Sequence, residues 1–125
     1  MGEEEVPSTE HVVQPGQLFA TTSSTGDIQV LTLAGEIDHD TGATLRQTLD
    51  LAGGPRPRVV VDMRQVTFMD STGINILITA HRALTQAGGW LRLADVEHSV
   101  MRTMQIVGID ALIDIRETLG QALTD

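Results

Sequence analysis

The chain contains no cysteine, so it has no disulfide framework, no thiol nucleophile and no cysteine-based metal site. It also has no apolar run near the ~18–20 residues that a membrane-spanning helix needs. Its first five residues include Glu3, Glu4 and Glu5 and no basic residue, which is unlike a secretory signal or a transit peptide. We therefore expect a cytoplasmic protein that does not enter a membrane.

Aromatic and basic residues are scarce. The chain has no tyrosine, one tryptophan and two phenylalanines, and its net charge is −9. Binding to nucleic acid requires cations that neutralise phosphates, and single-stranded nucleic acid also needs aromatic rings on which bases stack. We therefore expect no nucleic-acid partner.

The 125 residues are about the usual size of one domain, and 41% of them are hydrophobic, enough for one core. Residues 1–17 are different: they contain four acidic residues, no Lys or Arg and no hydrophobic periodicity. We predict a disordered acidic tail over residues 1–17 and a folded domain over residues 18–125. The tail either keeps the protein soluble or acts as an acidic arm that binds a partner.

Strand and helix patterns alternate along the predicted domain. Strands are expected over residues 18–23, 28–33, 58–63, 90–94 and 112–115, and helices over residues 41–52, 71–87, 97–107 and 117–123. The continuous run Val59-Val60-Val61 indicates a strand buried on both faces, hence a central one. This alternation predicts an α/β fold with a mostly parallel sheet and a hairpin at its start.

Some local features of these elements are predicted as well. Gly35 to Asp40 should end the second strand, and Asp40 or Thr41 can cap the first helix by accepting a backbone N–H. Gly108 is expected to end the helix over residues 97–107 in a left-handed conformation. The residues expected to face the core from these two helices are Thr41, Leu45, Thr48, Leu49, Ala52, Val100, Met104 and Val107.

The polar cluster Asp70-Ser71-Thr72-Gly73 stands where a strand pattern changes into a helix pattern. On a helical wheel Asn75, Thr79 and Arg82 fall within about 80° of Ser71, whereas the apolar residues of the helix lie opposite. Ser71 is therefore predicted to point outward at the start of a polar stripe. Ile78 borders this stripe, either as an apolar anchor for a partner or simply as a half-buried residue.

The position of Ser71 would suit a phosphorylation switch. Free backbone N–H groups and the helix dipole favour negative charge at a helix start. A phosphoserine would add ~−1.5 to −2 charges there, beside Asp70, and could repel a docked partner. The alternative from spacing alone is that Asp70 or Ser71 merely caps the helix.

Four segments resemble those of one family. Residues 68–74, Phe-Met-Asp-Ser-Thr-Gly-Ile, resemble the Met-Asp-Ser-Ser/Thr-Gly-Leu segment of anti-sigma factor antagonists, the STAS-domain family. Residues 33–38, Leu-Ala-Gly-Glu-Ile-Asp, are similar to its Gly-Glu-Leu-Asp segment. Residues 88–93 are similar to its Gly-Gly-x-Leu strand, and residues 100–110 to its closing helix and turn. The resemblance covers residues 18–116, in order and with short gaps.

The resemblance implies a STAS-like α/β fold, with a four- to five-stranded mixed sheet and helices packed mainly on one face. It implies that Ser71 is phosphorylated by an anti-sigma factor that is itself a Ser/Thr kinase. The unphosphorylated form would bind that anti-sigma factor and free the sigma factor, and a Ser/Thr phosphatase would reset the switch. No enzymatic activity and no cofactor are implied. The residues expected to contact the partner are Asp38, Asp70, Thr72, Asn75, Ile78, Thr79 and Arg82.

Asp38 is a second candidate at this site. Asp38 and Asp70 each follow a predicted strand, so in a parallel sheet both lie on the side of Ser71. Asp38 either lines the phosphosite and helps to position Ser71 or the metal-nucleotide of the kinase, or only stabilises its own turn.

Other functions were weighed against this one. Asp38, His39 and Asp40 are too close in sequence to converge on one metal ion, and no further His or acidic pair completes a shell. A hydrolase would need a nucleophile elbow, which the sequence around Ser71 does not contain. The remaining alternative is a STAS subunit of a transport complex or signalling scaffold, which would dock a partner without phosphorylation.

Overall fold

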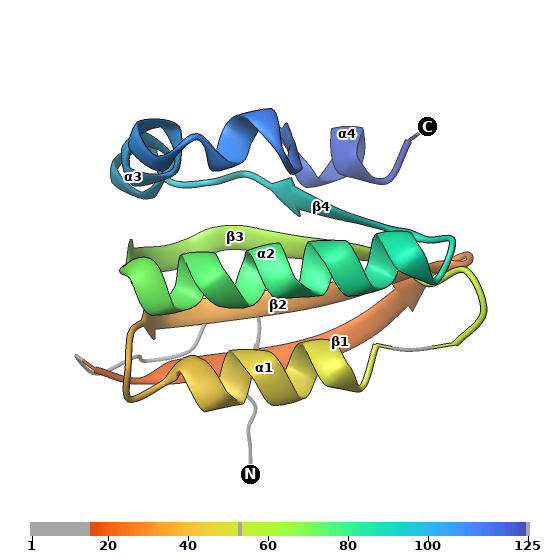
Figure 1. Cartoon of the computed structure of the whole chain (residues 1–125), viewed down its shortest axis with the longest axis horizontal. Helices are drawn as coiled ribbons and strands as arrows, with labels where there is room; N and C mark the ends of the chain where they lie inside the picture. Colours follow the sequence, from red (N-terminus) through yellow and green to blue (C-terminus); the bar gives the residue numbers. More distant parts are fainter. Residues whose placement is uncertain (1–15, 53, 125) are drawn as a thin grey trace, which may run out of the picture.

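Five strands form one mixed sheet in the spatial order β1-β2-β3-β4-β5 (Figure 1). The computed structural model describes residues 16–52 and 54–124. The strands are β1 (Leu18–Thr25), β2 (Ile28–Ile37), β3 (Arg58–Met69), β4 (Trp90–Ala94) and β5 (Asp114–Arg116). The helices are α1 (Gly42–Asp50), α2 (Ser71–Gln86), α3 (His98–Val107) and α4 (Leu119–Ala122), with a 3₁₀ turn η1 (Ile109–Ala111).

The strand directions bring the ends of β2 and β3 together. β1 and β2 pair as an antiparallel hairpin, and β2, β3, β4 and β5 are parallel to one another. The register places Ile37 at the end of β2 opposite Met69 at the end of β3. The expected α/β fold, with a mostly parallel sheet that starts with a hairpin, is confirmed.

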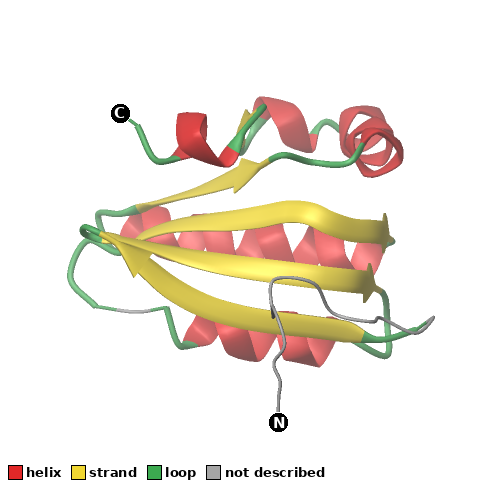
Figure 2. Ribbon diagram, turned by 180° about the vertical axis from the view of Figure 1, so that it is seen from behind, coloured by secondary structure: helices red, strands yellow, loops and turns green. Residues whose placement is uncertain are grey.

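Most of the helical cover lies on one face of the sheet. From behind, β1 and β2 lie in front of α1 and α2, with no described helix over these two strands (Figure 2). A smaller apolar cluster forms on the other face, where Ala122 of α4 meets Val60 and Ala94. This confirms the expectation that the helices pack mainly on one face.

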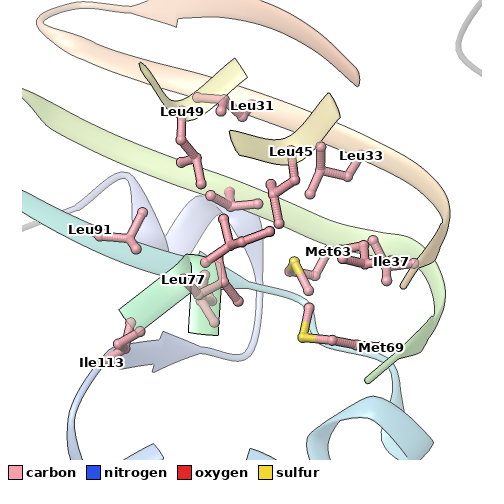
Figure 3. Packing of buried hydrophobic residues seen from close by; sticks show 14 of the residues in the cluster. Leu31, Leu33, Ile37, Leu45, Leu49, Met63, Met69, Leu77, Leu91 and Ile113 are labelled. Carbon is pink, nitrogen blue, oxygen red and sulfur yellow. The ribbon is translucent and has the colours of Figure 1, made fainter. Parts of the chain in front are cut away.

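The main core lies between the sheet and the helices α1, α2 and α3, and α3 contributes Val100 and Met104 to it. Its fully buried side chains include Leu33 from β2, Leu45 from α1, Met63 from β3 and Leu77 from α2 (Figure 3). Burying one such side chain contributes ~1.5–3 kcal/mol. This packing sets where the first turn of α2 stands on the sheet.

Three strands are longer than the sequence predicted, and the first of them, β1, continues to Thr25 instead of ending at residue 23. β2 continues through Gly35 to Ile37, although Gly35 was expected to end it, and β3 continues from Met63 to Met69. The pairing of β2 with β3 shifts register between Gly35 and Glu36, and Gly35 has φ 124°, a conformation that favours glycine. The bulge therefore bends β2 without ending it, and β3 runs directly into Asp70.

The predicted inward faces of the helices are mostly right. Leu45, Leu49, Val100 and Met104 are buried, whereas Thr48 is half-buried. Val107 was also expected to face the core, but it is 56% exposed. It is the last residue of α3, before Gly108 turns the chain with φ 80°, so its side chain lies beyond the packed part of the helix.

Of the predicted N-terminal tail, only Gly16 and Gln17 are among the described residues. Gly16 donates its N–H to Oε1 of Glu36 at 3.0 Å, and the Gln17 carbonyl accepts from Glu36 N–H at 2.9 Å. The rest of the predicted tail lies outside the described residues, so its disorder stays a prediction. Among the described helices, none is long and apolar enough to cross a membrane.

Replacing Gly73 with Ala tests the packing that holds α2 against the sheet. A Cβ at this position would lie 2.6 Å from Cγ2 of Ile37 and 2.8 Å from Cγ of Met69. Overpacking costs ~1–3 kcal/mol, which outweighs the helix propensity that alanine gains. We expect Gly73→Ala to lower the free energy of unfolding by about 1–2 kcal/mol, measured by urea denaturation.

Gly120→Ala in α4 is the control, because its Cβ would approach nothing closer than Oγ1 of Thr118 at 3.9 Å. If both variants unfold at the same urea concentration as the wild type, Gly73 is not a close-packed position.

Candidate functional site

The first turn of α2 is capped by Asp70. This residue is extended, and its Oδ1 accepts a hydrogen bond from the backbone N–H of Thr72 at 2.8 Å. Its carbonyl accepts from Ile74 N–H at 3.2 Å, the first bond of the helix. Of the two residues that could cap the helix, Asp70 does so, and the hydroxyl of Ser71 is left free of that task.

Ser71 is the first residue of α2 and is exposed. Its hydroxyl makes no hydrogen bond to any described residue. The N–H groups of a first helical turn have no partner within the helix, and they carry the positive end of its dipole. Ser71 Oγ is therefore accessible, and a negative group attached to it would be favoured by the helix.

The end of β2 is tied to this helix start. The backbone N–H of Asp70 donates to the Ile37 carbonyl at 3.1 Å. Asp38 follows Ile37 directly, so Asp38 and Asp70 leave neighbouring strand ends, as the sequence predicted.

Asp38 stabilises its own turn. Its Oδ1 accepts from the N–H groups of Asp40 at 2.9 Å and Thr41 at 3.0 Å. The Thr41 hydroxyl accepts from Asp38 N–H at 2.9 Å and donates to the Glu36 carbonyl at 2.8 Å. The turn-stabilising interpretation of Asp38 is thus observed.

The predicted cap of α1 is wrong. Thr41 precedes α1, but within the described chain its side chain accepts no bond from the first turn of that helix. Its hydroxyl is engaged by Asp38 and Glu36 instead. A hydroxyl that satisfies the preceding turn is not available to the following helix.

A groove runs between α1 and α2, which lie alongside each other on the same face of the sheet (Figure 1). Its volume is about 340 Å³. From α2 it is lined by Thr72, Asn75, Ile76, Thr79, Ala80 and Ala83, and from α1 by Arg46, Leu49 and Asp50. The groove is thus continuous with the first turn of α2.

The groove brings together only some of the predicted partner-binding residues. Thr72, Asn75 and Thr79 line it, whereas Arg82 is exposed outside it. Ile78 is half-buried and packs against the main core, so it is not a free apolar anchor.

The contribution of α1 to this surface was not predicted from the sequence. Arg46 and Asp50 are spaced by four residues, so they lie on one side of a helix. Helical periodicity could have placed them together, but not opposite α2, because that depends on how the two helices pack.

Carboxylates are frequent around the start of α2. Asp38 and Asp70 are half-exposed and Asp40 is exposed. Elsewhere, Glu97 caps α3 in the same way as Asp70 caps α2, and hydrogen bonds from the Ser99 N–H and hydroxyl lower the pKa of its carboxyl. Within residues 16–52 and 54–124, no group of three His, Cys, Asp or Glu side chains is placed to hold a metal ion.

Comparison with known proteins shows the family to which the described domain is similar. A family model described as STAS domain matches residues 20–122. The anti-sigma-B factor antagonist of Bacillus subtilis (strain 168) is 32% identical over 89 residues, which are 71% of this chain and 81% of that protein.

Two solved structures share the fold. An anti-sigma factor antagonist from Mycobacterium paratuberculosis superposes with a TM-score of 0.81 at 24% identity, over 90% of this chain and 96% of the other. The anti-sigma factor antagonist SpoIIAA in its unphosphorylated form superposes with a TM-score of 0.70 at 21% identity, over 84% and 93%.

Replacing Asp70 tests the cap. Asp70→Ala removes the acceptor for Thr72 N–H, and loss of such a cap costs ~0.5–2 kcal/mol. We expect the free energy of unfolding to fall by about 1 kcal/mol in urea denaturation. Asp70→Asn keeps a side-chain oxygen, so it should recover most of this loss, and equal stability of all three proteins would contradict the assigned cap.

Proposed function

The chain belongs to the STAS-domain family of anti-sigma factor antagonists, and we propose that it is switched by phosphorylation at Ser71. In this proposal the unphosphorylated protein binds an anti-sigma factor, which then releases its sigma factor. The phosphorylated protein does not bind, so the sigma factor stays captured. Membership of this family makes the protein a regulator rather than an enzyme.

The proposal rests on one observation: Asp70 caps the helix, and Ser71 is exposed and not needed for the cap. Asp70 satisfies the helix start through Thr72 N–H, so the exposed Ser71 hydroxyl can be modified without loss of the cap. The structure of SpoIIAA, an anti-sigma factor antagonist of the same fold, is that of its unphosphorylated form. The existence of a distinct unphosphorylated form in that protein supports a phosphorylation switch in this one.

The reacting group that this chain supplies is the accessible hydroxyl of Ser71. The anti-sigma factor acts as a Ser/Thr kinase that holds ATP. Ser71 Oγ attacks the γ-phosphorus, its proton passes to a base of the kinase, and ADP leaves. A Ser/Thr phosphatase later directs water onto the phosphorus of the phosphoserine, the P–O bond to Ser71 breaks, and inorganic phosphate leaves with the hydroxyl restored. In this proposal all of these steps take place in the cytoplasm.

The physical effect of the phosphate falls on the partner. A phosphoserine carries ~−1.5 to −2 charges, and at the N-terminus of a helix this charge is tolerated by the folded protein. A partner that packs an apolar or acidic surface against Ser71 would lose about 1–3 kcal/mol, or roughly 5- to 150-fold in affinity. Such a loss dissociates a micromolar complex while the fold persists.

The phosphosite is tested with the anti-sigma factor kinase of the same organism and ATP. Wild-type protein should gain the mass of one phosphoryl group, and Ser71→Ala should gain none. Ser71→Asp should bind the anti-sigma factor at least fivefold more weakly than wild type in calorimetry. Ser24→Asp, at an exposed position of β1 beside the start of β2, is the control and should bind normally.

Equal phosphorylation of Ser71→Ala and wild type would refute the site. Equal binding of Ser71→Asp and wild type would refute the switch, and a constitutive complex with a transport subunit would replace it with the docking alternative.

We also propose that Asp38 contributes its charge to the partner surface. Asp38→Asn keeps the Oδ1 acceptor that holds the N–H groups of Asp40 and Thr41, so the turn should remain folded. We expect slower phosphorylation of Ser71 and about fivefold weaker binding. Asp40→Asn removes a neighbouring charge whose carboxylate holds none of these bonds, and it is the control. If phosphorylation and affinity are unchanged in Asp38→Asn, Asp38 only stabilises its own turn and does not contribute to the partner surface.

A further inference from the structure

The groove between α1 and α2 has an apolar floor and a polar rim. Leu49 and Ile76 are each only 6% exposed, and they line it together with Ala80 and Ala83. Its volume of about 340 Å³ is at the small end of the ~300–1,000 Å³ usual for ligand pockets. The groove is therefore suited to one or two side chains of a protein partner rather than to a large ligand.

The packing of the two helices explains why the groove is open. α1 and α2 touch at their first turns, where a Cβ on Gly42 would lie 2.9 Å from Cγ2 of Thr72 and 3.1 Å from Cδ1 of Ile76. Further along α2, the groove is lined by Thr79, Ala80 and Ala83. These side chains are too short to fill the space beside Leu49, so a hollow remains next to the closest contact.

The rim of the groove carries an available cation. Arg46 and Asp50 are exposed, and in the described part of the chain neither forms an ion pair, with each other or with another residue. A guanidinium without a carboxylate partner can receive one in bidentate geometry. The groove thus offers an apolar cavity with an unpaired arginine at its edge.

We propose that this groove selects the anti-sigma factor by accepting an aliphatic side chain beside an acidic residue that pairs with Arg46. The inference rests on the proposed function. Thr72 is the residue after Ser71 and lines the groove, so a partner that covers the Ser71 hydroxyl extends into it. The apolar floor requires an aliphatic group, and Arg46 requires a carboxylate. A few centrally buried side chains carry most of the binding energy in protein interfaces, and close charge pairs across an interface contribute to specificity.

The experiment measures binding of the anti-sigma factor to groove variants by calorimetry. Arg46→Glu reverses the charge that recruits the carboxylate, and Thr79→Trp fills the groove from an exposed position. We expect each to weaken binding at least tenfold, whereas Arg46→Lys keeps the charge and should lose less than Arg46→Glu. Circular dichroism and urea denaturation establish that each variant is folded.

Two control variants match the groove variants in chemistry. Arg102→Glu reverses an exposed charge on α3, and Thr85→Trp adds an indole at an exposed position of α2 that does not line the groove. Both should bind within about twofold of wild type.

Ser71→Asp is measured in the same series, so that failure of the groove proposal can be distinguished from failure of the switch proposal. If Ser71→Asp weakens binding while Arg46→Glu and Thr79→Trp bind normally, the groove is not used and the switch stands. If the groove variants lose affinity while Ser71→Asp does not, the groove stands and the switch fails. If the controls weaken as much as the groove variants, the effect is not specific and the groove is rejected. A wild-type protein that binds no anti-sigma factor overturns both.

Discussion

The hydrogen bond from Thr72 N–H to the Asp70 carboxylate is the interaction on which the proposed switch depends. A helix start leaves backbone N–H groups without partners, and a serine at that place often satisfies one of them. Here the preceding aspartate does so, and the serine is exposed. A residue needed for the cap could be modified only by weakening the helix, whereas Ser71 can change its charge while the helix persists.

The same helix start is held firmly to the sheet. Asp70 N–H donates to the Ile37 carbonyl, and Gly73 lets the side chains of Ile37 and Met69 approach the helix closely. Two adjacent parallel strands therefore position the first turn of α2. A rigid position is useful for a switch, because a charge that moved away from an approaching partner would repel it less.

The partner surface in our proposals consists of two regions with different physical roles. Around Ser71, added charge decides whether a partner stays, because electrostatic repulsion acts on any apolar or acidic surface that covers it. In the groove, shape and the unpaired Arg46 decide which partner binds. Separating the two roles allows one modification to end binding without altering the residues that give specificity.

The sequence by itself determined the class of fold, the order of its elements and the exposed place of Ser71 at the start of α2. Those features follow from local periodicity and from the capping chemistry of neighbouring residues, which short stretches of sequence contain. The continuation of β2 through Gly35 was not predictable, because the bulge depends on pairing with β3. Only the tertiary structure decided that Arg46 and Asp50 share a groove with α2, because helix packing brings together residues that no sequence spacing relates.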